Sequence, residues 1–94
     1  MDRIAEKIKT NDSTVVDVRS PMEYAGGHVA NSINIPVNEL SFRMEEFKDM
    51  KKPIVLCCAS GARSGMATHI LQSNGIAEVY NGGSWLDVNS VYNR

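Results

Sequence analysis

Two adjacent cysteines, Cys57 and Cys58, are the residues of this chain best suited to covalent chemistry, and the sequence contains no other cysteine. Small residues follow them, then Gly61 and Arg63. A thiolate is a strong nucleophile, and a nearby arginine both stabilises it and offers a bidentate site to an oxyanion. The residue types and their spacing therefore indicate a nucleophilic thiolate that faces a small anionic substrate.

The segment 58–63, CASGAR, connects a predicted strand to a predicted helix. A short turn of small residues can aim several backbone N–H groups at one point and so form a nest for an anion. The helix that follows adds the positive end of its dipole, and both effects lower the pKa of a cysteine at the rim. Cys58 could instead be a buried small hydrophobic residue, but the glycine, the arginine and the helix start favour the functional interpretation.

Cys57 is expected to end the strand, so its side chain points to the opposite face of the sheet from that of Cys58. We therefore predict that Cys57 packs in the core. The alternative is a resolving thiol that forms a disulfide with Cys58 under oxidation. A structural disulfide between neighbours is a poor interpretation because it closes a strained ring. Free thiols fit a reducing compartment, and we expect a cytoplasmic protein.

Alternating strand-like and helix-like segments must position this loop, and they predict an α/β fold with a small parallel sheet flanked by helices. The expected strands are 14–18, 32–36 and 54–57, and 77–83 is expected to form a fourth strand and a turn. The expected helices lie around 4–8, after a Ser20-Pro21 start, across 40–47, around 67–71 and from 85 onward. In parallel sheets, ligands bind beyond the carboxyl ends of the strands, which places the cysteine loop and Arg19 at the same edge.

Four other residues near this edge have a weaker case for a part in the chemistry. Arg19 either adds positive charge near the loop or braces the strand end, and both interpretations stay open. Asp17 is predicted to be structural, because a buried carboxylate needs partners. His28 fits a structural hydrogen-bonding role, and Glu23 is accounted for as part of a helix cap.

Composition restricts the classes of protein to which the chain can belong. With 94 residues, of which 43% are hydrophobic and 22% are charged, we expect a single domain over 1–94. A net charge of -1 excludes a broad basic surface, so neither nucleic acid nor a membrane is an expected partner. There is no C-x-x-C pair, and His28 and His69 form no ligand cluster, so no zinc site is predicted.

The chain resembles the single-domain rhodaneses, a family of sulfurtransferases, over about residues 15–85. Three segments carry the resemblance by their order and separation: VVDVRSPMEYAGGHVANSINIP, IVLCCASGARS and EVYNGGSW. It implies a catalytic cysteine at the start of a C-x-x-G-x-R loop, which here is Cys58, and it implies no metal or organic cofactor. The chain departs from the family at Asn31-Ser32, where the family often has Gly-Ala, and in starting with a helix where the family usually has a strand.

The resemblance also implies a two-step transfer. The Cys58 thiolate attacks the outer sulfur of a small anionic donor such as thiosulfate, which leaves a persulfide and releases sulfite, and a thiol or cyanide acceptor then removes the sulfur. The residues expected to hold the donor and the persulfide charge are Ala59, Ser60, Gly61, Ala62, Arg63, Ser64 and Arg19. The similar cell-cycle phosphatases and arsenate reductases have a loop one residue longer, which argues against phosphatase activity here.

Two further functions remain open alongside this one. A persulfide carrier would use the same loop, but it would exchange sulfur with a partner protein in a sulfur relay. A non-catalytic rhodanese-like interaction domain is the other alternative, although such a module has no need of a reactive thiol.

Overall fold

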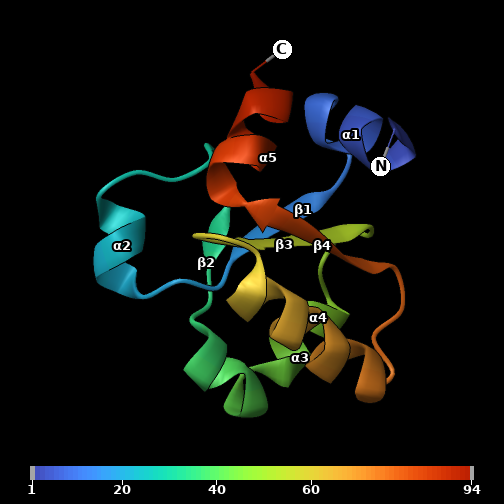
Figure 1. Cartoon of the computed structure of the whole chain (residues 1–94). Helices are drawn as coiled ribbons and strands as arrows, with labels where there is room; N and C mark the ends of the chain where they lie inside the picture. The colour runs from blue at the N-terminus through green and yellow to red at the C-terminus, as the bar shows by residue number, and fades with distance from the viewer. Residues whose placement is uncertain (1, 94) are drawn as a thin grey trace.

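The computed structural model describes residues 2–93, and four parallel strands form its single sheet (Figure 1). The strands are β1 (Thr14–Asp17), β2 (Ile33–Asn34), β3 (Ile54–Cys58) and β4 (Val79–Ser84), in the spatial order β2-β1-β3-β4. The predicted parallel α/β fold is therefore confirmed. The strand ends differ from the expected ones by at most two residues, and β3 extends to include Cys58.

β3 lies between β1 and β4, and all five of its residues are buried. Helices α1 (Asp2–Lys9) and α5 (Trp85–Tyr92) cover one face of the sheet, and α4 (Ala62–Ser73) covers the other (Figure 1). Successive β3 side chains alternate between the two faces, as a strand requires. Val55 and Cys57 pack with Ile8 and Val88 beneath α1 and α5, whereas Leu56 and Cys58 pack on the α4 face.

The short helix α2 (Pro21–Ala25) follows β1 and begins as the sequence predicts. Ser20 is its N-cap, and the Ser20 hydroxyl accepts a hydrogen bond from the backbone N–H of Glu23. The Glu23 carboxylate in turn accepts from the backbone N–H of Ser20, which completes a capping box. The loop after α2 contains Asn31 with φ of 67°, so this asparagine adopts the left-handed conformation that the expected turn needs.

The prediction of one helix across 40–47 is wrong. The chain forms a 3₁₀ helix, η1 (Val37–Phe42), and a separate short helix, α3 (Met44–Lys48), with a break at Arg43. Leu40 and Phe47 are nevertheless both buried in the same cluster. Two short helices with a bend satisfy the same apolar pattern, and spacing over so few residues does not distinguish them from one α-helix.

Candidate active site

The Cys58 sulfur lies under the loop that joins β3 to α4, and three hydrogen bonds converge on it. Its Sγ accepts from the backbone N–H of Gly61 at 3.0 Å, and from the backbone N–H and the hydroxyl of Ser64, both at 3.4 Å. Gly61 has φ of 103°, a conformation that glycine adopts without strain and that turns the chain into α4, where the Ser64 N–H lies. Backbone N–H groups of the loop and of the first turn of α4 therefore converge on one point, as the sequence indicates.

These hydrogen bonds control the ionisation of Cys58. Burial by itself raises the pKa of the thiol, since only 1% of the residue is exposed. The Ser64 hydroxyl and the backbone N–H groups of Ser64, Gly61 and Ser60 outweigh burial and lower the pKa to about 7. Cys58 is thus buried, as the alternative interpretation held, but it is surrounded by donors that favour the thiolate.

Cys57 has the opposite character. Its side chain is fully buried on the other face of the sheet, as predicted, and both cysteines are free thiols. Burial, reinforced by the negative charge of Asp17, raises the pKa of Cys57 to about 12. Cys57 is therefore a protonated core residue at neutral pH.

Asn81, on β4, holds the cysteine loop in place, and the sequence analysis did not single it out. The Ser64 hydroxyl donates to Asn81 Oδ1 at 2.7 Å, and Asn81 Nδ2 donates to the backbone carbonyl of Gly61 at 3.2 Å. The hydroxyl has one proton, so Asn81 and the Cys58 sulfur share it. An asparagine inside a strand, a polar residue with low strand propensity, was the only sequence signal for this role.

Arg63 lies beside the loop, but its guanidinium already has a carboxylate partner. Nη1 and Nη2 donate to Glu23 Oε1 and Oε2 at 2.7 and 3.0 Å, in a bidentate pair. The two side chains are 35% and 38% exposed. The hydrogen bonds from Arg63, followed by that from the Ser20 backbone, lower the pKa of Glu23 to about 2. Glu23 therefore has a second contact that its part in the helix cap did not predict.

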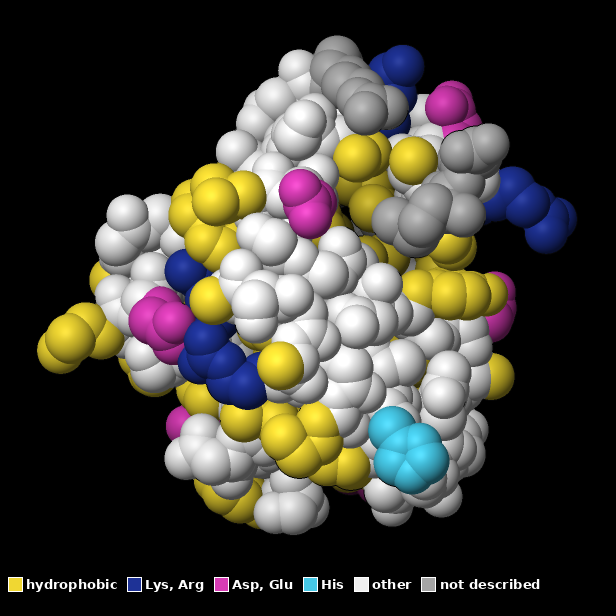
Figure 2. All heavy atoms as spheres, viewed as in Figure 1, with side chains coloured by type: hydrophobic (Ala, Val, Ile, Leu, Met, Phe, Trp, Pro, Cys, Tyr) yellow, Lys and Arg dark blue, Asp and Glu magenta, His cyan; other side chains and the backbone are white. Residues whose placement is uncertain are grey.

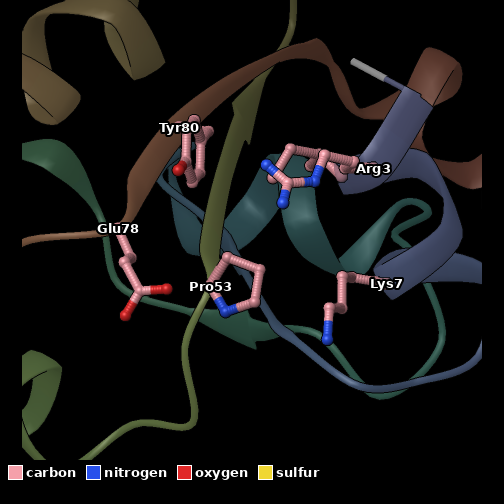
Figure 3. Close-up of a pocket in the computed structure, with 6 residues that line it drawn as sticks. Arg3, Lys7, Pro53, Glu78 and Tyr80 are labelled. Carbon is pink, nitrogen blue, oxygen red and sulfur yellow. The ribbon is translucent and has the colours of Figure 1, made fainter.

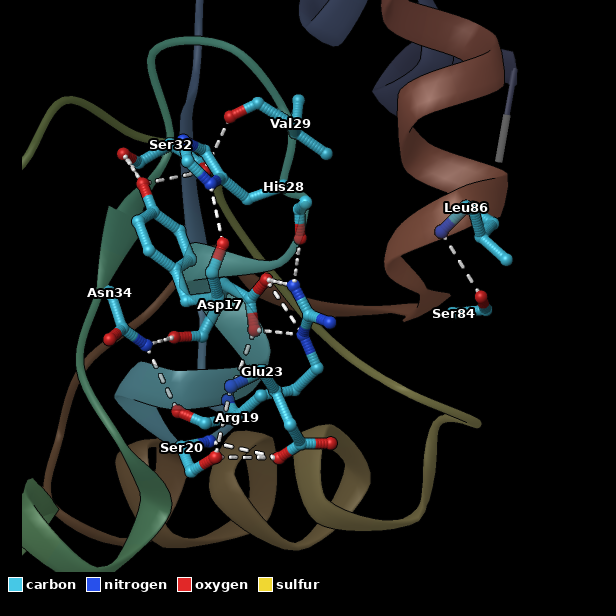
Figure 4. A network of polar contacts seen from close by, with 12 residues as sticks. Asp17, Arg19, Ser20, Glu23, His28, Val29, Ser32, Asn34, Ser84 and Leu86 are labelled. Carbon is cyan, nitrogen blue, oxygen red and sulfur yellow. Dashed lines mark hydrogen bonds and ion pairs between the residues drawn. The ribbon is translucent and has the colours of Figure 1, made fainter.

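Arg19 makes the contacts expected of a brace at the strand end (Figure 4). Its Nε donates to both carboxylate oxygens of Asp17 at 2.9 and 3.0 Å, and its Nη2 donates to Asp17 and to the Gly27 carbonyl, both at 2.7 Å. The pair is buried, and the guanidinium carbon lies 4.8 Å from the centroid of the Trp85 ring. Asp17 is thus the partnered structural carboxylate that we predicted. Binding of substrate by Arg19 stays a prediction.

His28 also has structural contacts. Its ring stacks on Tyr24, with 3.8 Å between the ring centroids, and its Nδ1 lies 2.7 Å from the Tyr24 carbonyl oxygen. These contacts connect α2 to the loop that follows it and agree with the hydrogen-bonding role expected for His28.

A pocket lies at the other end of the sheet from Cys58 (Figure 3). Pro53 directly precedes β3 and Glu78 directly precedes β4, so this pocket faces the amino ends of the strands. Its remaining lining residues are Arg3, Ile4, Lys7 and Tyr80. Because Cys58 is at the carboxyl end of β3, the pocket is separate from the candidate active site.

The comparisons with known proteins agree on one family. The family model "Rhodanese-like domain" matches residues 1–86. The chain is 42% identical to the uncharacterized protein YqhL of Bacillus subtilis (strain 168), over 71% of this chain and 52% of YqhL. It is 35% identical to the thiosulfate sulfurtransferase PspE of Escherichia coli (strain K12), over 78% of this chain and 71% of PspE. The chain thus spans about half of YqhL and a larger share of PspE.

Two more matches extend this result. The chain is 29% identical to the putative sulfur carrier protein YrkF of Bacillus subtilis (strain 168), over 86% of this chain and 44% of YrkF. A solved structure described as rhodanese with anions from E. coli superimposes with a TM-score of 0.72 at 34% identity, covering 80% of this chain and 89% of that one. The relatives thus include sulfurtransferases and a putative sulfur carrier. The chain belongs to the rhodanese family.

Proposed function

We propose that this chain transfers sulfane sulfur from thiosulfate or a similar donor to a thiol or cyanide acceptor through a persulfide on Cys58. The observation that carries the proposal is the environment of the Cys58 sulfur, which accepts three hydrogen bonds and whose pKa is lowered to about 7. At neutral pH a large fraction of this thiol is thiolate, which is the nucleophilic form.

In the first step, the Cys58 sulfur forms a bond to the outer sulfur of thiosulfate. The S–S bond inside thiosulfate breaks, and its electron pair leaves with sulfite, so the negative charge of the thiolate moves to the terminal sulfur of the persulfide. In the second step, the acceptor attacks that terminal sulfur and regenerates the thiolate. Neither step requires an external oxidant or reductant.

The loop is suited to hold the charge that these steps move. N–H groups that already converge on Cys58 belong to Gly61 and Ser64, and the turn also contains the N–H groups of Ala59, Ser60 and Ala62. We propose that this set binds the persulfide charge, as an oxyanion hole does. Arg63 is proposed as the residue that binds the anionic donor, in competition with its partner Glu23.

Mass spectrometry of the intact chain after treatment with thiosulfate tests the proposal directly. We expect a gain of one sulfur atom that persists in Cys57→Ser and disappears in Cys58→Ser. Cys57→Ser is the matched control because it changes the neighbouring thiol on the opposite face of the sheet. A gain that depends on Cys57 and not on Cys58 would contradict the assignment.

A persulfide carrier in a sulfur relay is the second candidate. Its support is the similarity to the putative sulfur carrier YrkF and the pairing of Arg63 with Glu23, which leaves less positive charge for a small dianion. A carrier would accept sulfur from a persulfide-bearing protein and turn thiosulfate over poorly in a steady-state assay with cyanide. A non-catalytic interaction domain is less well supported, because such a module does not need the hydrogen-bond donors that lower the pKa of Cys58.

The predicted cytoplasmic location remains part of this proposal. No helix among residues 2–93 is long and apolar enough to cross a membrane.

A further inference from the structure

The Glu23–Arg63 ion pair connects two segments that follow different strands. Glu23 lies on α2, after β1, and Arg63 lies at the start of α4, directly after the cysteine loop. Basic and acidic side chains touch at the surface on the α2 side of the molecule (Figure 2), in agreement with the bidentate contact of 2.7 and 3.0 Å. An incoming anion that binds the Arg63 guanidinium must therefore share this group with Glu23 or displace the Glu23 carboxylate.

Displacing Glu23 is opposed by its other hydrogen bonds. Its Oε1 accepts from the Ser20 backbone N–H and lies within hydrogen-bond distance of the Ser20 hydroxyl, both at 3.1 Å. These contacts are half of the capping box of α2, so a carboxylate that leaves Arg63 also loosens the start of this helix. Glu23 is thus a held carboxylate and not a freely mobile side chain.

The second arginine at this edge supplies no surplus charge either. Arg19 is paired with Asp17 in a buried bidentate contact, so both arginines are matched by carboxylates. Ionisation of Cys58 therefore leaves the site with uncompensated negative charge.

We propose, on the basis of the function proposed above, that Glu23 determines donor selectivity by neutralising Arg63, so that the site favours sulfur donors with one negative charge over dianionic thiosulfate. A dianion that approaches the Cys58 thiolate meets like charge that the Arg63–Glu23 pair does not offset. A donor with one charge fewer meets less repulsion and needs no displacement of Glu23.

Thiosulfate and methanethiosulfonate are a suitable pair of probes for this proposal. Each transfers a terminal sulfur to Cys58, and the breaking S–S bond leaves its electron pair on sulfite or on methanesulfinate. The two donors differ by one negative charge, because a methyl group replaces one oxygen. Their ratio of reactivity therefore reports the charge that the site tolerates. It cancels any change in the nucleophilicity of Cys58, which affects both donors alike.

The test is the rate constant for persulfide formation on Cys58, measured by mass spectrometry of quenched samples for each donor. We expect Glu23→Gln to raise the ratio of the thiosulfate rate constant to the methanethiosulfonate rate constant by about 3- to 10-fold. This is the effect of removing one negative charge that solvent partly screens. Glutamine at this position keeps the capping box, so the variant is expected to fold. Glu46→Gln is the matched control, because Glu46, on α3, forms a bidentate pair with Arg43, and it should leave the ratio unchanged.

A second variant tests whether the effect passes through Arg63. Adding Arg63→Gln to Glu23→Gln should return the ratio to that of the unsubstituted chain or below it. An unchanged ratio in Glu23→Gln, or a gain that survives the loss of Arg63, would overturn the inference while persulfide formation still supported the proposed function. If neither donor modifies Cys58 in the unsubstituted chain, the proposed function itself is wrong and the inference falls with it.

Discussion

Two groups of residues at the carboxyl edge of the sheet have the same composition and opposite character. The buried set consists of Cys57, Asp17 and Arg19, and the loop set consists of Cys58, Glu23 and Arg63. Each set has a thiol, and in each an arginine pairs with a carboxylate through two or more hydrogen bonds. Residue types alone therefore do not decide which set could perform chemistry.

The difference between the two sets arises from the hydrogen-bond donors and from burial. Burial and the Asp17 charge raise the pKa of Cys57 to about 12, whereas donors in the loop lower that of Cys58 to about 7 even though it is also buried. The Asp17–Arg19 pair is at most 6% exposed, and the Glu23–Arg63 pair is more than one-third exposed. An ion pair of the same chemical type is thus a buried structural brace in one place and a partly exposed contact in the other.

The largest predicted contrast is the reactivity of the two thiols with iodoacetamide. At pH 7 the pKa values of about 7 and about 12 predict roughly a 10⁴-fold or greater excess of thiolate at Cys58. The Cys58 rate should rise as the pH increases through about 7 and then level off, because the thiolate is the deprotonated form. Peptide mapping after alkylation measures both sites. Equal labelling of the two cysteines in the folded chain would remove the contrast.

The next contrast concerns the two ion pairs and the free energy of unfolding. Arg19→Met leaves Asp17 as an unpaired buried carboxylate and should lower the free energy of unfolding by about 3–5 kcal/mol. Arg63→Met should have little effect on this free energy, because its partner Glu23 remains partly exposed to water. Urea denaturation of the two variants side by side gives the comparison. A larger loss for Arg63→Met than for Arg19→Met would reverse the assignment of brace and accessible pair.

A smaller effect is expected when one donor in the loop set is removed. Ser64→Ala eliminates the hydroxyl that lies 3.4 Å from the Cys58 sulfur and 2.7 Å from Asn81. The pKa of Cys58 should rise, so the pH profile of alkylation moves to higher pH and the rate at pH 7 falls by about 3- to 10-fold. Thr68→Ala removes a hydroxyl one turn further along α4 and serves as the control. A profile that stays in place would show that the backbone N–H groups alone set the ionisation.

The smallest effect should come from Cys57. Cys57→Ala removes one buried sulfur atom and should lower the free energy of unfolding by about 1 kcal/mol through loss of packing. The pH profile of Cys58 alkylation should not move, since the Cys57 side chain packs on the opposite face of the sheet. Thermal or urea denaturation and the alkylation profile together check this. A shifted profile would assign Cys57 a part in the chemistry, as the resolving-thiol alternative holds.

Local sequence patterns predicted most of the elements and the distinction between the cysteines. The strand period separated Cys57 from Cys58, and Ser20, Pro21 and Glu23 matched a helix start that the structure contains. Patterns of this kind work because hydrogen bonds within a cap or a turn, and alternation along a strand, depend on neighbours in the chain. The same patterns failed at 40–47, where one apolar stripe fits either one α-helix or a 3₁₀ helix followed by a short α-helix.

Contacts between segments far apart in the chain were decided by the tertiary structure. The sequence by itself determined a parallel α/β fold and the rhodanese resemblance, and it predicted a nucleophilic cysteine in the loop after β3. The order of the strands then brought α2 beside the loop, which paired Glu23 with Arg63, and placed Asn81 of β4 against Ser64. The fold also buries the pair of Asp17 and Arg19, which are close neighbours in the chain. Each of these polar groups had several chemically suitable partners, and only their distances in the folded chain determined which ones they meet.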